Sequence, residues 1–177
     1  EQEHGPHSVK LAPDGNSFYI IAGNITHLPE NITSYRTPTV WKRDNILPDL
    51  SQYEARPTVA AGWIAHVDST GMNWEIVAAG FRNPFDIAFN ESGDLFTYDS
   101  DMEWDIGMAW YRPTRICHVP SGGEFGWRDG NGKWSPNYLD NLPPVLNIGQ
   151  GSPTNMMSLN DARFPKRYHQ TLLAFDW

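Results

Sequence analysis

The chain has 177 residues, of which 40% are hydrophobic and 13% aromatic, and this length can bury one core without demanding a second domain. Its formal net charge is −8 and no cluster of lysine or arginine stands out, which argues against a nucleic-acid backbone or an anionic membrane as partner. The single cysteine, Cys117, excludes an internal disulfide, and no apolar run is long enough to span a bilayer.

The first predicted element is a hairpin over residues 8–24. This stretch, SVKLAPDGNSFYIIAGN, holds an apolar run, a Pro-Asp-Gly turn and a second run of β-branched and aromatic residues. The 15 glycines and 14 prolines divide much of the chain into similar short runs, which suit strands better than long helices. The sequence therefore predicts an all-β fold.

A long insert follows, at about residues 27–61. It is polar and interrupted by prolines, and a loop of this length inside a compact domain is usually functional or disordered. Residues 62–68 and 73–78 then alternate apolar and polar side chains on either side of a Ser-Thr-Gly turn. This pattern predicts a second hairpin.

The rest of the chain continues in the same way, with two more hairpin patterns and three later apolar runs. The hairpins are expected at residues 85–89 with 95–98, and at 115–119 with 124–127. The later runs are residues 145–148, 155–159 and 171–175. We therefore expect two successive sets of four strands and the first half of a third set.

Recurring units of four antiparallel strands are typical of β-propeller blades. The expected fold is a partial six-bladed propeller of about two and a half blades, with residues 1–177 forming part of a single propeller domain. Two and a half blades cannot close a ring, so we expect the chain to be a fragment of a longer protein. A β-sandwich of similar strand count is the alternative, but a Greek key would not require such matched hairpins.

An acidic loop follows the strand at residues 95–98. Asp99, Asp101, Glu103 and Asp105 recur at every second position, a spacing that can direct hard oxygen ligands to one side. A solvated turn is the simpler interpretation. The mutual repulsion of four carboxylates favours a site for a cation of the size of calcium.

Arg82-Asn83-Pro84 stands ahead of the strand at residues 85–89. Arg82 offers a planar guanidinium suited to a ligand carboxylate, and Asn83 offers both a donor and an acceptor. Arg82 could equally clamp a connection between blades through backbone carbonyl groups. The motif alone leaves both roles open.

Four passages in this order resemble the six-bladed quinoprotein glucose and sorbosone dehydrogenases, which use pyrroloquinoline quinone, and look closest to their bacterial membrane-bound branch. They are Glu3-His4 with the later Pro13-Asp14-Gly15; the stretch that begins Phe81-Arg82-Asn83-Pro84; the acidic loop from Asp99; and residues 122–127, GGEFGW. Each passage is common by itself, whereas their ordered combination is fairly specific.

The resemblance implies a hydride transfer from a sugar carbon to the quinone while a histidine takes the hydroxyl proton. It places His4 as the general base, with Glu3 beside it. It implies that Arg82 and Asn83 contact the quinone and that Asp99, Asp101 and Asp105 bind calcium. One family feature is missing, since His7-Ser8 occupy the place of an arginine that follows the catalytic histidine.

The resemblance also implies a sugar or polyol substrate, a cytochrome as possible electron acceptor, and a periplasmic or extracellular location. The lysine and arginines of later blades would lie beyond Trp177. Two other functions remain open from the sequence. One is a non-catalytic propeller that binds carbohydrate or protein, and the other is a calcium-dependent propeller hydrolase in which His4 and the acidic loop activate water.

Overall fold

The structure is a computed structural model that describes residues 3–38, 61–103, 109, 111–128, 132–133, 137–159 and 163–177. Strands dominate the described residues, which contain no α-helix, only one short 3-10 helix, η2 (Lys166–Tyr168). The all-β prediction is confirmed. No helix in this described part of the chain has the length and apolar character needed to cross a membrane.

The first sheet contains five strands. They are β1 (Pro6–Leu11), β2 (Ser17–Ala22), β3 (Ile32–Tyr35), β4 (Gly62–Asp68) and β5 (Trp74–Phe81), in the spatial order β1-β2-β4-β5-β3. In this order β1, β2, β4 and β5 pair antiparallel with their neighbours, as the two predicted hairpins require. The predicted first set of four strands is therefore confirmed.

Strand β3 was not predicted, because it lies inside the polar insert at residues 27–61. It pairs parallel with β5, with Ile32 opposite Trp74 and Tyr35 opposite Ile76. Only Ile32 of β3 packs against a core cluster, so the segment lacks the alternation that marks a half-buried strand. The remainder of the insert, residues 39–60, lies outside the described residues.

The second sheet is antiparallel and has four strands. They are β6 (Pro84–Phe89), β7 (Leu95–Asp99), β8 (Thr114–His118) and β11 (Leu146–Gly149), in the order β11-β8-β7-β6. The prediction of residues 124–127 as the fourth strand is wrong, since β11 holds that place. The Phe125 N–H donates to the Ala79 carbonyl at 2.9 Å and its ring stacks on Phe81, so this segment docks on β5 of the first sheet.

Two smaller sheets complete the fold. Strands β9 (Trp127–Arg128) and β10 (Gly132–Lys133) form a short pair, and β12 (Pro153–Leu159) and β13 (Thr171–Asp176) form a hairpin. The hairpin confirms the strands predicted at residues 155–159 and 171–175. The strand predicted at residues 145–148 exists, but it belongs to the second sheet and not to a third set.

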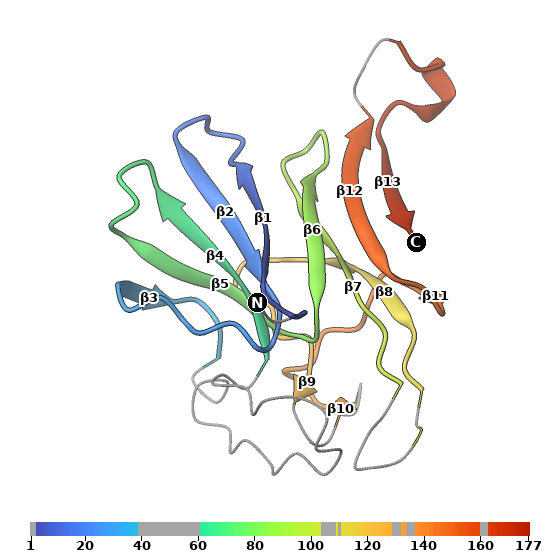
Figure 1. The fold of residues 1–177 in the computed structure, drawn as a ribbon. Coiled ribbons are helices and arrows are strands. Elements are labelled where there is room, and N and C mark those ends of the chain that lie inside the picture. Colours follow the sequence, from blue (N-terminus) through green and yellow to red (C-terminus); the bar gives the residue numbers. More distant parts are fainter. Residues whose placement is uncertain are drawn as a thin grey trace.

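The first strands of three sheets, β1, β6 and β12, lie side by side, and their sheets fan outward from them (Figure 1). Asp86 of β6 joins all three strands. Its Oδ2 accepts a hydrogen bond from the Met156 N–H at 3.0 Å and lies 2.9 Å from the Lys10 Nζ. A core of buried side chains from the first two sheets, including Ile21, Phe81 and Ile87, lies between these sheets. None of the sheets closes on itself.

Candidate active site

A group of polar residues gathers where the chain enters β1 and β6. We call it the entrance cluster, and its members are His4, His7, Asn24, Arg82 and Asn83. The cluster brings together residues that are up to 79 positions apart in sequence. The predicted base, His4, and the predicted quinone contacts, Arg82 and Asn83, all belong to it.

His4 is buried, with 1% of its surface exposed, and its Nδ1 lies 2.5 Å from the Oδ1 of Asn24. Because an amide oxygen only accepts hydrogen bonds, the imidazole donates from Nδ1 in this pair. The hydroxyl of Thr26 also donates to the His4 carbonyl at 3.1 Å. The ring is therefore held by the segment that follows β2.

Asn24 is the residue of this site that sequence reasoning missed. It follows a predicted strand and stands 20 positions from His4, so only the pairing of β1 with β2 brings the two together. Glu3, the predicted helper of His4, is exposed. The role of Glu3 stays a prediction.

Asn83 lies against His7, and Gly23 lies between Asn83 and the His4 backbone. The His7 Nε2 lies 2.7 Å from the Oδ1 of Asn83, and the His7 ring stacks on Phe85 with 4.6 Å between ring centroids. A Cβ on Gly23 would come within 2.5 Å of the Asn83 Oδ1 and 2.7 Å of the His4 carbonyl oxygen. This close approach requires glycine at position 23, and it sets His4 and Asn83 on either side of it.

Arg82 holds two connections together. Its carbonyl accepts the Asn24 N–H at 2.8 Å, and its Nη1 donates to the Asp101 carbonyl at 2.8 Å. Its Nη2 forms a long ion pair of 3.7 Å with Glu103, whose side chain is 60% exposed. Arg82 thus acts as the backbone clamp that the sequence allowed. A quinone contact remains a prediction beside that role.

Asp99 is fully buried at the end of β7 and is occupied by protein donors. Its Oδ2 lies 2.9 Å from the Arg115 Nη2 in a buried ion pair, and its Oδ1 accepts the N–H groups of Arg82 and Asn83 at 3.1 and 3.0 Å. Arg115 also donates to the carbonyls of Phe125 and Gly80. This arrangement does not fit a calcium ligand, because a metal at Asp99 would displace these donors.

The rest of the acidic loop is only partly described. Burial, with a further contribution from Glu103, raises the pKa of Asp101 above its usual range. Asp105 lies outside the described residues. Within the ranges that the structure describes, no group of three or more His, Cys, Asp or Glu side chains is arranged to hold a metal. The calcium site therefore stays a prediction.

Two solved structures have a similar fold. One is an oxidoreductase from Thermus thermophilus, named as a glucose dehydrogenase, with a TM-score of 0.55 and 17% identity over 88% of this chain and 42% of its own. The other is the PQQ-bound form of aldose sugar dehydrogenase from Streptomyces coelicolor, with a TM-score of 0.55 and 12% identity over 97% of this chain and 49% of its own.

No protein-family model and no curated protein matches the chain. The chain spans less than half the length of either structural neighbour. At such low identity the likeness concerns the fold and leaves activity, substrate and cofactor open. By fold, this chain is similar to parts of two proteins that are named as sugar dehydrogenases.

Proposed function

We propose that this chain is part of a six-bladed propeller dehydrogenase that oxidises a sugar or polyol with pyrroloquinoline quinone. The observation that carries the proposal is that His4, Arg82 and Asn83 lie around Gly23 and Asn24, at the ends of adjacent inner strands, with Arg82 joined to Asn24 through its backbone carbonyl. The fold of the two neighbours supports it. The sugar or polyol substrate, the quinone and the electron acceptor are all part of what we propose.

The entrance cluster has groups that fit the quinone. A guanidinium (Arg82) and an amide (Asn83) suit its carboxylates and carbonyls, and the Phe85 ring beside them is 36% exposed and offers a surface to a planar molecule. Because Gly23 has no side chain, Asn83 and the His4 carbonyl can both lie close to its backbone. When bound, the quinone would supply the chemistry of a hydride acceptor.

His4 would take the proton of the substrate hydroxyl. Its hydrogen bond to Asn24 keeps a proton on Nδ1, so Nε2 is the nitrogen that accepts in the neutral ring. Since the ring is only 1% exposed, a bound substrate has to displace what covers it. Glu3 would lie nearby at the exposed entry to β1.

Calcium enters the proposal through Asp101 and Asp105 only, because the Asp99 carboxylate is already engaged by Arg115. A cation beside Asp101 and Glu103 would offset the repulsion between their carboxylates. The proposal further includes a periplasmic or extracellular location and a cytochrome as electron acceptor.

The test is dye reduction by the complete propeller that contains this chain, reconstituted with calcium and the quinone, over a panel of aldoses and polyols. We expect His4→Ala to lower the rate at least about 100-fold, the usual contribution of a positioned acid or base, and Arg82→Ala to lower the rate by weakening the binding of the quinone. The matched controls are His27→Ala and Arg167→Ala, which remove exposed side chains of the same kinds.

Two results would contradict the proposal. Absence of quinone binding would favour a non-catalytic binding propeller, a role that the burial of His4 also favours. Cleavage of an ester or lactone without the quinone would favour a calcium-dependent hydrolase.

A further inference from the structure

A cavity of about 260 Å³ lies between the first and second sheets, away from the entrance cluster. Phe89, which lines it, ends β6, whereas Asn83 directly precedes that strand. A strand rises about 3.3 Å per residue, so the two sites are roughly 15–20 Å apart. The cavity is therefore separate from the proposed quinone site.

Two segments that are hydrogen-bonded to β5 build one side of the cavity. The N–H of Arg36, just after β3, donates to the Ile76 carbonyl at 2.8 Å, and the N–H of Gly122 donates to the Val77 carbonyl at 2.7 Å. Gly122 has a φ of +86°, and a Cβ there would lie 2.9 Å from the Arg36 carbonyl oxygen. The two segments thus fit closely together, and the unpredicted strand β3 is what brings Arg36 to the cavity.

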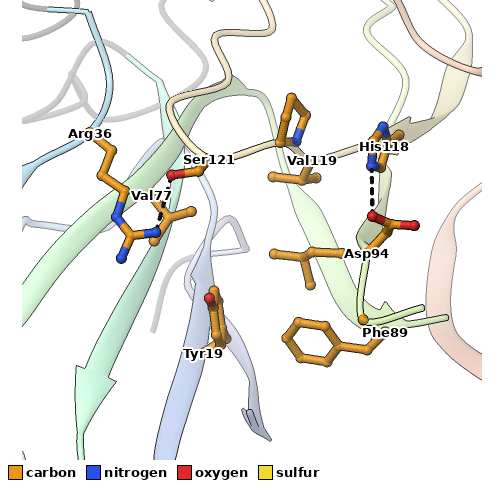
Figure 2. A pocket seen from close by; sticks show the side chains of 11 residues that line it. Tyr19, Arg36, Val77, Phe89, Asp94, His118, Val119 and Ser121 are labelled. Carbon is orange, nitrogen blue, oxygen red and sulfur yellow. Dashed lines mark hydrogen bonds and ion pairs between the residues drawn. The ribbon is translucent and has the colours of Figure 1, made fainter. Parts of the chain in front are cut away.

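The charged groups that line the cavity already have partners. Arg36 forms an ion pair with Glu75 and donates to the Ser121 Oγ at 3.1 Å. On the other side of the cavity, the His118 Nε2 lies 3.9 Å from the Asp94 Oδ1 (Figure 2). An ionic ligand would compete with these pairs. A neutral hydroxyl could instead use the further donors of the guanidinium and the further acceptor positions of the carboxylate.

The remaining wall combines apolar surface with the hydroxyl group of Tyr19. Tyr19 and Phe89 meet edge to face with 5.2 Å between centroids, and Val77 and Leu95 lie beside them in the lining. Figure 2 shows the Tyr19 and Phe89 rings between Arg36 on one side and the contact of His118 with Asp94 on the other. Apolar surface flanked by hydrogen-bonding groups suits a ring with one apolar face and a rim of hydroxyls.

We propose that this cavity binds a neutral, hydroxylated ring molecule of the size of a monosaccharide. The volume is slightly below the range of about 300–1,000 Å³ that is usual for drug-sized ligands, which favours a small molecule. The inference does not depend on the proposed redox function. It adds a second sugar site between the sheets, lined by residues that play no part in the entrance cluster.

The test uses nuclear magnetic resonance of the isotopically labelled chain with three probes of the same ring size. They are methyl glucoside, glucuronate and glucosamine, which are neutral, anionic and cationic. We expect methyl glucoside to shift the amide signals of Gly93 and Ser121. The two charged probes should bind at least about tenfold more weakly, since each competes with a contact that Arg36 or Asp94 already makes.

Tyr19→Phe and Ser121→Ala nearly keep the side-chain bulk, and each should weaken the binding of methyl glucoside at least about threefold. The control is Thr33→Ala on exposed β3, which should leave the binding unchanged. The shifts at Gly93 and Ser121 should persist in His4→Ala, which separates this site from the entrance cluster. The inference is overturned by glucuronate or glucosamine binding as tightly as methyl glucoside, or by methyl glucoside leaving Gly93 and Ser121 unmoved.

Discussion

The Nδ1 of buried His4 lies 2.5 Å from the Oδ1 of Asn24, so a neutral amide orients this imidazole. An amide fixes the tautomer as a carboxylate would, but it does not stabilise the imidazolium form by charge. In this hydrogen bond His4 therefore faces an uncharged partner. This relationship yields the first prediction.

Asn24→Asp should move the titration midpoint of His4 to higher pH, because a carboxylate in contact with the ring favours its protonated form. Nuclear magnetic resonance of the His4 ring protons measures the midpoint directly. In the reconstituted enzyme, the acidic limb of the rate profile should move in the same direction, since a base must be deprotonated to act. The control is Asn31→Asp, whose side chain contacts the loop of Gly71 and Met72 and not His4. An unmoved midpoint in Asn24→Asp would show that the amide does not tune the ring.

Asp99→Asn should destabilise the fold by about 3–5 kcal/mol, because it leaves the Arg115 guanidinium buried without its counter-charge. Urea unfolding followed by tryptophan fluorescence gives the free energy of unfolding. Glu75→Gln is the control, since it breaks the more exposed pair with Arg36, and its cost should be about 1 kcal/mol or less. Similar losses in both variants would mean that the buried pair is not the stabilising element we describe.

Asp101→Asn should stabilise the protein at pH 7. Burial raises the pKa of Asp101 above its ordinary value of 3.8, so the folded state disfavours the ionised side chain. Below pH 3.8 this carboxyl is protonated in the folded and in the unfolded state, and the gain in the free energy of unfolding from Asp101→Asn should vanish. Unfolding measured across pH 3–7 tests this sign.

Asp68→Asn provides a comparison of opposite sign. Hydrogen bonds from Asn73 and Thr70 lower the pKa of Asp68 to about 2, so its ionised form favours the folded state. Asp68→Asn should therefore reduce stability at pH 7, with the difference shrinking as the pH falls from 3.8 toward 2. If both variants shift stability in the same direction, the assigned environments are wrong.

Asp86→Ala should loosen the contact between the second sheet and the β12–β13 hairpin. It removes the acceptor for the Met156 N–H and the partner of Lys10, at a cost of about 1–3 kcal/mol. Hydrogen exchange at the Met156 amide should accelerate, while the Ile64 amide in the first sheet keeps its protection. Unchanged protection at Met156 would show that Asp86 does not join the inner strands.

Much of the fold could be predicted, because alternating side chains and turn residues are local features. The strands of the first two hairpins and the pair β12–β13 follow from them. The places of β3 and β11 could not be predicted, since pairing over a long separation depends on contacts that no local pattern encodes. Phe125 illustrates this, because it was predicted in a strand of the second set, whereas its ring packs against Phe81 of the first sheet.

The candidate site was predictable only through motifs. Arg82 and Asn83 were found by their sequence neighbours, whereas no motif links Asn24 to His4, which it reaches through strand pairing. Asp99 has the spacing of a metal ligand, but the sequence cannot show that Arg115 is buried against it. The identity of a charged partner 16 positions away decides the role of that carboxylate.

The most direct test of the account is a titration of pyrroloquinoline quinone into the complete, isotopically labelled propeller that contains this chain, followed by nuclear magnetic resonance. The account predicts that the amide signals of His4, Gly23 and Asn83 move together, and that Arg82→Ala weakens the binding at least about tenfold. Quinone that leaves these three amides unmoved, or that binds equally well to Arg82→Ala, would contradict the claim that the entrance cluster is the quinone site.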